Sequence, residues 1–398
     1  MREWKPEPRM TTPRLPPAPW TQRADLAALI AALGVGNARY VGGAVRDTLL
    51  DIGVKDVDLA TVLEPETVIA RLDAAGIRSV PTGIDHGTVT AVLRGGPVEI
   101  TTLRRDVATD GRRATVAFAT DWREDAARRD FTINALYADP VTREIFDYFG
   151  GLDDLAQRRV RFIGDARERI REDHLRILRY FRFQARFGSQ PADLVSESAC
   201  TELAATLKGL SRERIGMEML NLLGLDDPAP TVTRMADLGV LAVVLPEADP
   251  QSLARLVAEE RRQGVAPDPI RRLAALLPPD PSLAEQVAAR FRLSGAQRKR
   301  LATAAARETG PDDPRALAYR LGRAEALDRL LLAGADIAPL AGWEIPVFPL
   351  KGGAIVARGV TAGPEVARIL RAVEAHWVAE GFPDAARVGA LLDEALQR

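Results

Sequence analysis

Two aspartates separated by one residue are the feature of this sequence with the clearest chemical meaning. Asp56 and Asp58 lie in K-D-V-D-L-A-T, inside an apolar run. A strand alternates its side chains between two faces, so both carboxylates are expected on one face. Carboxylates this close repel each other unless a cation lies between them, and oxygen ligands suit Mg²⁺. The pair therefore predicts the metal site of two-metal phosphoryl transfer, with a solvated strand edge as the alternative for an isolated D-x-D.

A second candidate site precedes the aspartates, in Y-V-G-G-A-V-R-D. The pattern predicts a strand that ends at Val41, a turn at Gly42 and Gly43, and a helix from Ala44 onward. Glycines let backbone N–H groups approach a ligand closely, and the N-terminus of a helix favours an anion. Arg46, on the first turn of that helix, would hold the same phosphate with its two-pronged guanidinium. Taken alone, a Gly-Gly turn is more often a tight connection.

The segment E-D-H-L-R-I-L-R-Y-F-R-F, residues 172–183, predicts recognition of a nucleobase. On a helix its arginines share one side and its apolar residues the other. Asp173 and Arg176 are three residues apart and would be neighbours. Cytosine and adenine each present an amine beside an unprotonated ring nitrogen, which a carboxylate and an arginine can bind, whereas uracil and guanine reverse this pattern. The pair would therefore select C and A without a template; an arginine-rich helix laced by ion pairs is the alternative.

Three segments in this order carry a family resemblance: G-G-A-V-R-D…D-V-D-L-A-T, then R-R-D-F-T-I-N-A-L at residues 128–136, then residues 172–183. Together they resemble the head of class II nucleotidyltransferases of the polymerase-β superfamily. These are the tRNA CCA-adding enzymes and the bacterial poly(A) polymerases. Agreement over three ordered blocks is far more specific than agreement over any one of them.

The resemblance implies a role for each block. The residues it assigns to nucleotide binding are Gly43, Arg46, Arg129, Asp173, Arg176, Arg179 and Arg182. The first three would position the triphosphate, the next two would read the base, and the last two would assist with base and phosphates. Asp56 and Asp58 would be the catalytic residues and hold two Mg²⁺ ions, with CTP and ATP as substrates.

Other residues keep two interpretations each. Asp130 and Asn134 would shape the ribose pocket, where an ionised acid accepts from the 2′-hydroxyl, or else cap a short helix and close a turn. Glu99 would be a third acid near the metals or an outward strand residue, and is left out of the site. The charged stretch Arg104–Trp122 predicts a mobile loop, similar to the loop that helps CCA-adding enzymes switch from C to A, with an exposed hairpin as the alternative.

Composition limits the class of protein. With 398 residues the chain exceeds one typical domain, and 54 Lys+Arg against 55 Asp+Glu leave no global positive field for RNA. Basic surface must be local, and residues 158–186 supply it with ten arginines against four acids. The single cysteine, Cys200, excludes an internal disulfide and a zinc cluster, which predicts the reducing cytoplasm. No apolar run predicts a membrane span or a signal peptide.

The expected fold class is α+β: a small mixed-sheet nucleotidyltransferase head followed by an all-helical neck, body and tail. The expected divisions are a disordered Pro-rich extension (1–22), the head (23–155), a neck that binds base and RNA (156–225), and a body and tail that bind tRNA (226–398). Within these, helices are expected over Asp25–Leu33 and over Leu210–Leu223, the latter with a serine cap. Proline-rich breaks near residues 267 and 278 separate further short helices.

Two positions depart from the family pattern. Asn221 stands where a neck lysine is expected, and Ala354 stands where an acid is expected in the tail, the part that grips the tRNA elbow in the family. The segment Thr82–Thr90 lacks the G-R-R-F-x-L-like strand usual in poly(A) polymerases, which favours CCA addition.

The resulting hypothesis is template-independent addition of C, C and A to tRNA 3′ ends, with release of pyrophosphate. The partners would be the tRNA 3′ end with its acceptor and elbow regions, and no membrane. A poly(A) polymerase and a CC-only or A-only enzyme stay open. From a different class, so does a non-catalytic RNA-binding protein, although loss of a metal acid would mark one and both acids are present.

Overall fold

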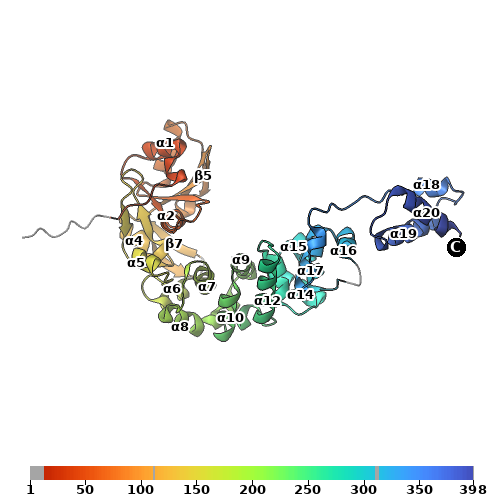
Figure 1. The fold of residues 1–398 in the computed structure, drawn as a ribbon. Helices are drawn as coiled ribbons and strands as arrows, with labels where there is room; N and C mark the ends of the chain where they lie inside the picture. Colours follow the sequence, from red (N-terminus) through yellow and green to blue (C-terminus); the bar gives the residue numbers. More distant parts are fainter. Residues whose placement is uncertain (1–12, 111–112, 310–312, 398) are drawn as a thin grey trace, which may run out of the picture. The chain divides into compact units, whose positions relative to one another are not determined.

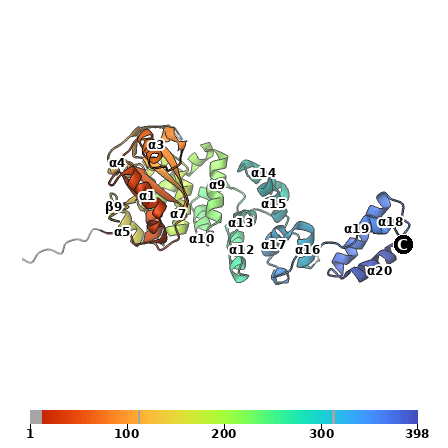
Figure 2. The same ribbon diagram turned by 90° about the horizontal axis from the view of Figure 1, so that it is seen from above.

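The structure is a computed structural model that describes residues 13–110, 113–309 and 313–397. It divides into two compact units, with the boundary after Leu210. Figures 1 and 2 show a sheet with helices in the first unit and helices in the second. The boundaries predicted at 155 and 225 divide the chain more finely than these two units do, and they stay predictions. Most of the predicted neck belongs to the same unit as the head, and the last helix of the neck belongs to the same unit as the body.

A mixed sheet of seven strands forms the centre of the first unit, as expected for an α+β head. In spatial order its strands are β3 (Ser79–Gly83), β4 (Thr88–Leu93), β5 (Gly96–Thr102), β2 (Val57–Thr61), β1 (Ala38–Val41), β8 (Leu136–Ala138) and β9 (Ile145–Asp147). Strands β2 and β5 are parallel, and the other neighbours in this sheet are antiparallel. The central strand β2 therefore lies between an antiparallel and a parallel neighbour, which fixes its register from both sides.

The stretch predicted as a mobile loop forms a hairpin in its described part. Strands β6 (Arg104–Asp110) and β7 (Arg113–Phe118) pair antiparallel as a separate two-stranded sheet. Val and Thr, which favour strands, recur along both segments. Residues 111 and 112, at the turn, lie outside the described residues.

Helices of the first unit pack on the sheet and on each other. They are η1 (Pro19–Gln22), α1 (Ala24–Leu33), α2 (Gly43–Leu49), α3 (Pro65–Ala74), η2 (Ile84–His86), α4 (Trp122–Ala127), η3 (Thr132–Asn134), α5 (Gly151–Ala156), α6 (Ala166–Glu172), α7 (Arg176–Phe187), α8 (Leu194–Glu202) and η4 (Ala204–Gly209). The helix predicted over Asp25–Leu33 is confirmed as α1, which buries Leu26, Leu29 and Leu33 at helical spacing. Helix α1 packs on α3, and α2 packs on β1, β2 and β8.

The N-terminal extension is partly ordered, so the prediction of disorder is wrong for residues 13–22. Leu15 is 1% exposed, and its N–H donates to the Arg143 carbonyl at 2.8 Å, next to the edge strand β9. The Trp20 ring lies edge-on against Tyr40, with centroids 4.7 Å apart. These two apolar contacts help to hold a segment whose proline content had suggested disorder. Residues 1–12 lie outside the described residues.

The second unit contains helices and no strands in its described part. Its helices are α9 (Arg212–Leu223), α10 (Ala229–Asp237), α11 (Val240–Val244), α12 (Pro250–Arg262), α13 (Pro269–Leu276), α14 (Pro281–Arg290), α15 (Gly295–Ala305), α16 (Pro314–Leu321), α17 (Arg323–Leu332), η5 (Ala338–Leu340), α18 (Gly352–Val356), α19 (Pro364–Ala379) and α20 (Ala385–Leu396). The predicted helix over Leu210–Leu223 is confirmed as α9. Ser211 holds its N-cap position, but the side chain makes no capping hydrogen bond.

Aspartate followed by proline begins four helices of this unit: α12, α13, α14 and α16. Each aspartate accepts a hydrogen bond from a backbone N–H of the first turn, and each proline occupies the first helical position. The proline needs no N–H partner there, and its φ suits a helix. This confirms the predicted breaks near residues 267 and 278.

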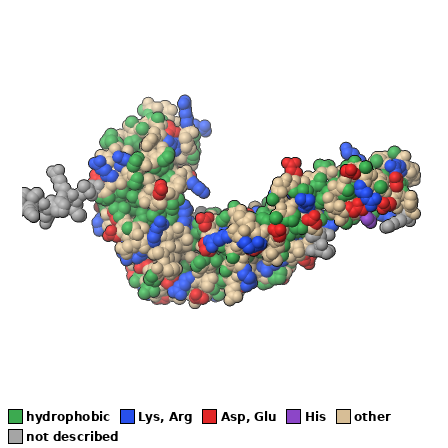
Figure 3. Space-filling view, viewed as in Figure 1, with side chains coloured by type: hydrophobic (Ala, Val, Ile, Leu, Met, Phe, Trp, Pro, Cys, Tyr) green, Lys and Arg blue, Asp and Glu red, His purple; other side chains and the backbone are tan. Residues whose placement is uncertain are grey.

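Several features of the surface bear on function. On the face shown in Figure 3, basic and acidic side chains are interspersed over the helical unit, in line with the net charge of −1. The two departures from the family pattern, Asn221 and Ala354, are both exposed on helices.

In the described part of the chain, none of the helices combines the length and apolar character that a membrane crossing requires.

Candidate active site

The two predicted metal acids lie at the start of the central strand β2. Asp56 precedes the strand and Asp58 is its second residue, while Val57 and Leu59 point into the core at 5% and 0% exposure. The alternation predicted from the sequence is therefore confirmed. Across the parallel pairing, Asp58 is in register with Glu99 of β5. Glu99 and Asp56 are both near enough to Asp58 to act on its charge.

This arrangement disfavours a negative charge on Asp58. Burial, together with the nearby Glu99 and Asp56, raises the pKa of Asp58 to about 6, and Arg129 opposes that rise. A bound cation would relieve the repulsion. No set of three His, Cys, Asp or Glu side chains among the described residues is grouped closely enough to hold a metal. Two carboxylates with ligand positions left for phosphate and water are what Mg²⁺ accepts, so the residues fit this ion.

The glycine turn lies between β1 and α2, as predicted. Gly42 has φ 68°, a conformation that other residues adopt only with strain. A Cβ at Gly42 would lie 3.5 Å from Nη1 of Arg129, and one at Gly43 would lie 3.7 Å from Nη2 of Arg46. The two glycines therefore lie between the two arginines that were assigned to the triphosphate.

Arg46 is more enclosed than predicted. It is 6% exposed, its Nε donates to Asp47 at 2.8 Å, and its Nη1 donates to the Asn134 side chain. Its guanidinium lies over the Phe187 ring at 4.1 Å. Burial lowers the pKa of Arg46, which the carboxylate of Asp47 partly offsets. The side chain is thus part of the wall of the site, with one edge toward Gly43.

Arg129 is held along one edge of its guanidinium. Its Nη2 donates to Asp125 at 3.2 Å and its Nε donates to the Tyr137 hydroxyl at 3.1 Å. Its Nη1 faces Gly42, and its charge acts on Asp58. The structure therefore brings Arg129 together with both the glycine turn and the metal acids, as the predicted site requires.

Asp130 and Asn134 join the head to helix α7. Asp130 accepts from Arg179 Nε at 2.9 Å and from Asn134 Nδ2 at 2.9 Å. Burial alone would raise the pKa of Asp130, but Arg179 and Asn134 hold it below its usual value. The N-cap of η3 is Phe131, so Asp130 does not cap that helix, whereas Asn134 does end it. The capping alternative is therefore met for Asn134 and not for Asp130, and the ribose-pocket role stays a prediction.

The base-reading pair is arranged differently from the prediction. Helix α6 ends at Glu172 and α7 begins at Arg176, so Asp173 lies in the break between two helices. Its carboxylate accepts from the N–H of Leu175 at 3.1 Å. Arg176 donates to the Glu172 carboxylate and to the backbone carbonyl groups of Arg169 and Arg128. The predicted continuous face is therefore wrong, although both side chains stay near the start of α7.

Helix α7 otherwise has the two predicted sides. Ile177, Leu178 and Phe181 are buried, while Arg179 and Arg182 are partly exposed. The guanidinium of Arg182 lies 4.9 Å from the centroid of the Phe183 ring.

The stretch 158–186 presents less positive charge in the structure than its composition suggests. Acids from outside it, at Asp154, Glu202, Asp130 and Asp47, pair with its arginines. The arginines with a carboxylate partner are Arg159, Arg161, Arg167, Arg169, Arg171, Arg176, Arg179 and Arg186. Much of the predicted positive field is therefore neutralised within the unit.

Sequence reasoning missed Asp125 and Tyr137, which fix Arg129. Asp125 precedes Arg128 and Arg129 by three and four residues, the spacing of neighbours on a helix, and that spacing was the available signal. Tyr137 comes from strand β8, and no local pattern links it to Arg129.

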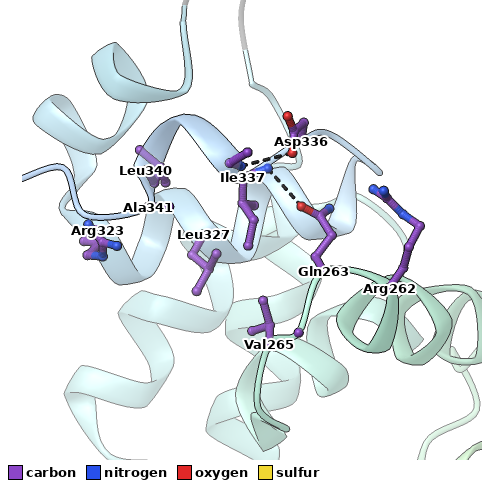
Figure 4. Close-up of a pocket in the computed structure, with 11 residues that line it drawn as sticks. Arg262, Gln263, Val265, Arg323, Leu327, Asp336, Ile337, Leu340 and Ala341 are labelled. Atoms are coloured by element: carbon purple, nitrogen blue, oxygen red, sulfur yellow. Dashed lines mark hydrogen bonds between the residues drawn. The ribbon is translucent and has the colours of Figure 1, made fainter.

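A cavity of about 440 Å³ lies in the second unit, at the end of α12 (Figure 4). Val265, Leu327 and Ile337 line it, and Gln263 accepts a hydrogen bond from the Ile337 N–H at 2.9 Å. None of the predicted site residues contributes to it. The candidate active site is therefore identified by its chemistry and not by this cavity.

Comparison with known proteins identifies the family of this chain. Residues 38–161 match the family "Poly A polymerase head domain", and residues 194–252 match "Probable RNA and SrmB- binding site of polymerase A". The chain is 35% identical to mouse CCA tRNA nucleotidyltransferase 1, mitochondrial, over 86% of this chain and 83% of that protein, and 34% identical to the human protein over the same shares.

Solved structures give the same result. The Bacillus stearothermophilus CCA-adding enzyme in complex with CTP is 28% identical, with a TM-score of 0.73 over 94% of this chain and 98% of that chain. The Thermotoga maritima CCA-adding enzyme complexed with tRNA has the same fold, with a TM-score of 0.65 at 20% identity. Because identity with the mouse protein extends over most of both chains, this protein belongs to the class II family of CCA-adding enzymes and poly(A) polymerase heads.

Proposed function

We propose that this protein adds C, C and A to the 3′ ends of tRNA, using CTP and ATP and releasing pyrophosphate. The observation that carries the proposal is the 35% identity to a CCA tRNA nucleotidyltransferase over 86% of the chain, and it is supported by Asp58 on β2 and Asp56 directly before that strand. The body and tail would bind the acceptor and elbow regions of the tRNA.

In the proposed reaction, the 3′-oxygen of the RNA forms a bond to the α-phosphorus of the nucleotide, and the bond to pyrophosphate breaks. Asp56 and Asp58 would hold two Mg²⁺ ions. When bound, the metal supplies a lowered pKa at the 3′-hydroxyl and charge compensation for the leaving pyrophosphate. The glycine turn and Arg129 would orient the triphosphate through the N–H groups and guanidinium that line it.

The base would be read at the start of α7. Asp173 would accept from the exocyclic amine of C or A, and Arg176 would donate to the ring nitrogen. In this structure Arg176 donates a hydrogen bond to Glu172. To bind the base, Arg176 would either give up that hydrogen bond or keep it and contact the base as well. Arg179 and Arg182 would assist with base and phosphates.

Replacing Asp173 with alanine is expected to relax the choice of base. Without the carboxylate, the amine of C or A loses its acceptor, and the carbonyl of U is no longer repelled. Discrimination against UTP, measured as the ratio of kcat/KM values, should fall by about 10- to 100-fold. Asp193→Ala, which removes the capping acid of α8, is the matched control and should keep discrimination. Unchanged discrimination with lost nucleotide binding would contradict the role.

Affinity for Mg²⁺ is expected to depend on pH with a midpoint near the pKa of Asp58, about 6. A metal ligand must be deprotonated, so protons compete with the metal below that pKa. The apparent affinity should fall about tenfold per pH unit below the midpoint and level off above it. Titration of Mg²⁺ on either side of the midpoint, followed by the thermal stability of the protein, measures this. Affinity that is flat across the midpoint would argue against Asp58 as a ligand.

The function is tested with tRNAs that lack all, two or one of the terminal nucleotides, supplied with each nucleoside triphosphate separately. Addition of two C and then one A supports the proposal. Long A tracts on generic RNA would identify a poly(A) polymerase, and addition that stops after CC or adds only A would identify a partial enzyme. RNA binding without any addition would identify a non-catalytic protein.

We also propose that the protein works in the cytoplasm. Its one cysteine, Cys200, is buried and free, so the chain has no internal disulfide, which suits a reducing compartment. The mouse and human relatives carry the word mitochondrial in their names. Fractionation of the source cells distinguishes the compartments.

A further inference from the structure

Asp125 is a fully buried acid that accepts hydrogen bonds from Arg129 and from the residues around it. It lies in α4, is 1% exposed, and accepts from Arg129 Nη2 at 3.2 Å and Arg128 Nε at 2.7 Å. It also accepts from the Tyr137 hydroxyl at 2.6 Å. Burial alone would raise the pKa of Asp125, but the two arginines hold that pKa below its usual value. The acid is therefore ionised and fixed by several donors at once.

Tyr137 completes the arrangement from strand β8. Its hydroxyl donates to Asp125 and accepts from Arg129 Nε at 3.1 Å, and its residue is fully buried. Together the two residues bind Nε and Nη2, which form one edge of the guanidinium. Because that group is planar and rigid, fixing one edge fixes the direction of the other nitrogen. That nitrogen, Nη1, faces the turn at Gly42.

The backbone around Arg129 is fixed as well. Arg169 Nη2 donates to the Arg129 carbonyl at 3.0 Å, and Asp125 accepts from the N–H of Arg104 at 3.3 Å. Asp125 thus connects the first residue of the β6–β7 hairpin to the arginine that faces the glycine turn. An Arg side chain loses considerable rotamer freedom when it is held in one geometry, so holding it in advance lowers the cost of binding an anion.

We propose that Asp125 and Tyr137 are positioning residues that hold Arg129 with Nη1 directed at the triphosphate of the incoming nucleotide. The inference rests on the proposed function, in which Arg129 binds that triphosphate. Neither residue touches the nucleotide; both act through Arg129. Since the triphosphate is common to CTP and ATP, their effect does not depend on the base.

The test measures binding of CTP and of ATP, each with Mg²⁺, to the full chain without tRNA. Asp125→Asn is expected to weaken both nucleotides by the same factor, about 10- to 100-fold, because a charged partner of Arg129 is lost. Tyr137→Phe, which removes only the hydroxyl, is expected to weaken both by about 3- to 10-fold. In steady-state addition the loss should appear mainly in KM.

A double variant separates positioning from a merely structural role. Arg129→Met removes the group through which Asp125 acts, so adding Asp125→Asn to it should change nucleotide affinity little further. Asp328→Asn is the matched control, because Asp328 is also fully buried and bound by two arginines but belongs to the second unit. It should lower thermal stability and keep nucleotide affinity.

Two outcomes would overturn the inference. One is wild-type affinity in Asp125→Asn, and the other is a loss that is fully additive with that of Arg129→Met. Should Asp125→Asn not fold, Tyr137→Phe alone decides, by weakening both nucleotides or leaving both unchanged. Failure of the wild-type protein to bind either nucleotide would instead refute the proposed function, so the two failures are distinguishable.

Discussion

Replacing Asp58 with asparagine is expected to reduce nucleotide addition by about 10³-fold or more and at the same time to stabilise the metal-free protein at neutral pH. The loss of activity follows because a carboxylate ligand of the proposed metal site disappears, and metal charge supplies several kcal/mol of transition-state stabilisation. Asparagine keeps the shape of the side chain, so β2 should keep its pairing with β1 and β5.

The gain in stability follows from the pKa of Asp58, about 6 in the fold against an ordinary value of 3.8. A raised folded pKa means that the folded chain holds its proton more tightly than the unfolded chain. The resulting stabilisation is complete below the ordinary pKa and is lost as pH rises through about 6. The ionised side chain therefore costs up to ~3 kcal/mol at neutral pH, which asparagine avoids.

Thermal unfolding with a chelator, at pH values below 4 and above 6, measures this effect. The wild-type protein should lose stability across that range relative to Asp58→Asn, and Mg²⁺ should restore it only in the wild type. Glu99→Gln is the matched control: it removes a neighbouring charge that raises the pKa of Asp58, so it should move the midpoint to lower pH while both metal acids remain. An Asp58→Asn protein that is active, or less stable at neutral pH, would contradict the metal site.

The sequence predicts those parts of the site that depend on neighbouring residues. Alternation along a strand placed Asp56 and Asp58 on one side, and the glycine pair placed the turn before α2. Both follow from backbone geometry over a few residues. The register between Asp58 and Glu99 depends instead on how β2 pairs with β5, about 40 residues later in the chain, and sequence alone left the role of Glu99 open.

The segment around Asp173 and Arg176 shows a limit of another kind. Residues 173–175 contain neither proline nor glycine, so Asp173, a residue type common at helix starts, is the one signal of the break between α6 and α7. The break forms where the Asp173 carboxylate accepts from the Leu175 N–H, a local bond that competes with the helix. The helical pattern of the sequence therefore runs on through residues 172–176, whereas the structure divides this segment between α6 and α7.

Contacts between distant segments explain the remaining differences. Arg46 and Asn134 are 88 residues apart, and Arg179 and Asp130 are 49 apart, yet each pair shares a hydrogen bond. The partners of these arginines could not be predicted from the spacing of residues in the sequence. Several arginines that were expected to face a ligand therefore already donate hydrogen bonds to a carboxylate or an amide. Arg129 is fixed by its hydrogen bonds to Tyr137 and Asp125, and its proposed role in binding phosphate requires such a fixed geometry.

The second unit depends on a buried group of charges that has no part in the chemistry. Glu260 of α12 is 1% exposed and accepts from Arg271 Nε at 2.7 Å and from Arg272 Nε at 2.8 Å. Arg272 also donates to the Leu223 carbonyl at 2.8 Å, at the end of α9. Arg271 donates to Asp328 of α17 at 3.3 Å. One acid thus holds two arginines that connect α9, α12, α13 and α17.

Replacing Glu260 with glutamine is therefore expected to destabilise the second unit by about 3–5 kcal/mol, because it leaves two buried guanidinium groups with one anion fewer. The matched control is Glu247→Gln. Glu247 binds Arg290 through two hydrogen bonds at 2.9 and 2.7 Å, but both side chains are partly exposed, so this change should cost about 1 kcal/mol or less. Denaturant unfolding of the full chain, followed by hydrogen exchange in α9 and α13, measures both. Equal losses in the two variants would mean that burial does not set the strength of this network.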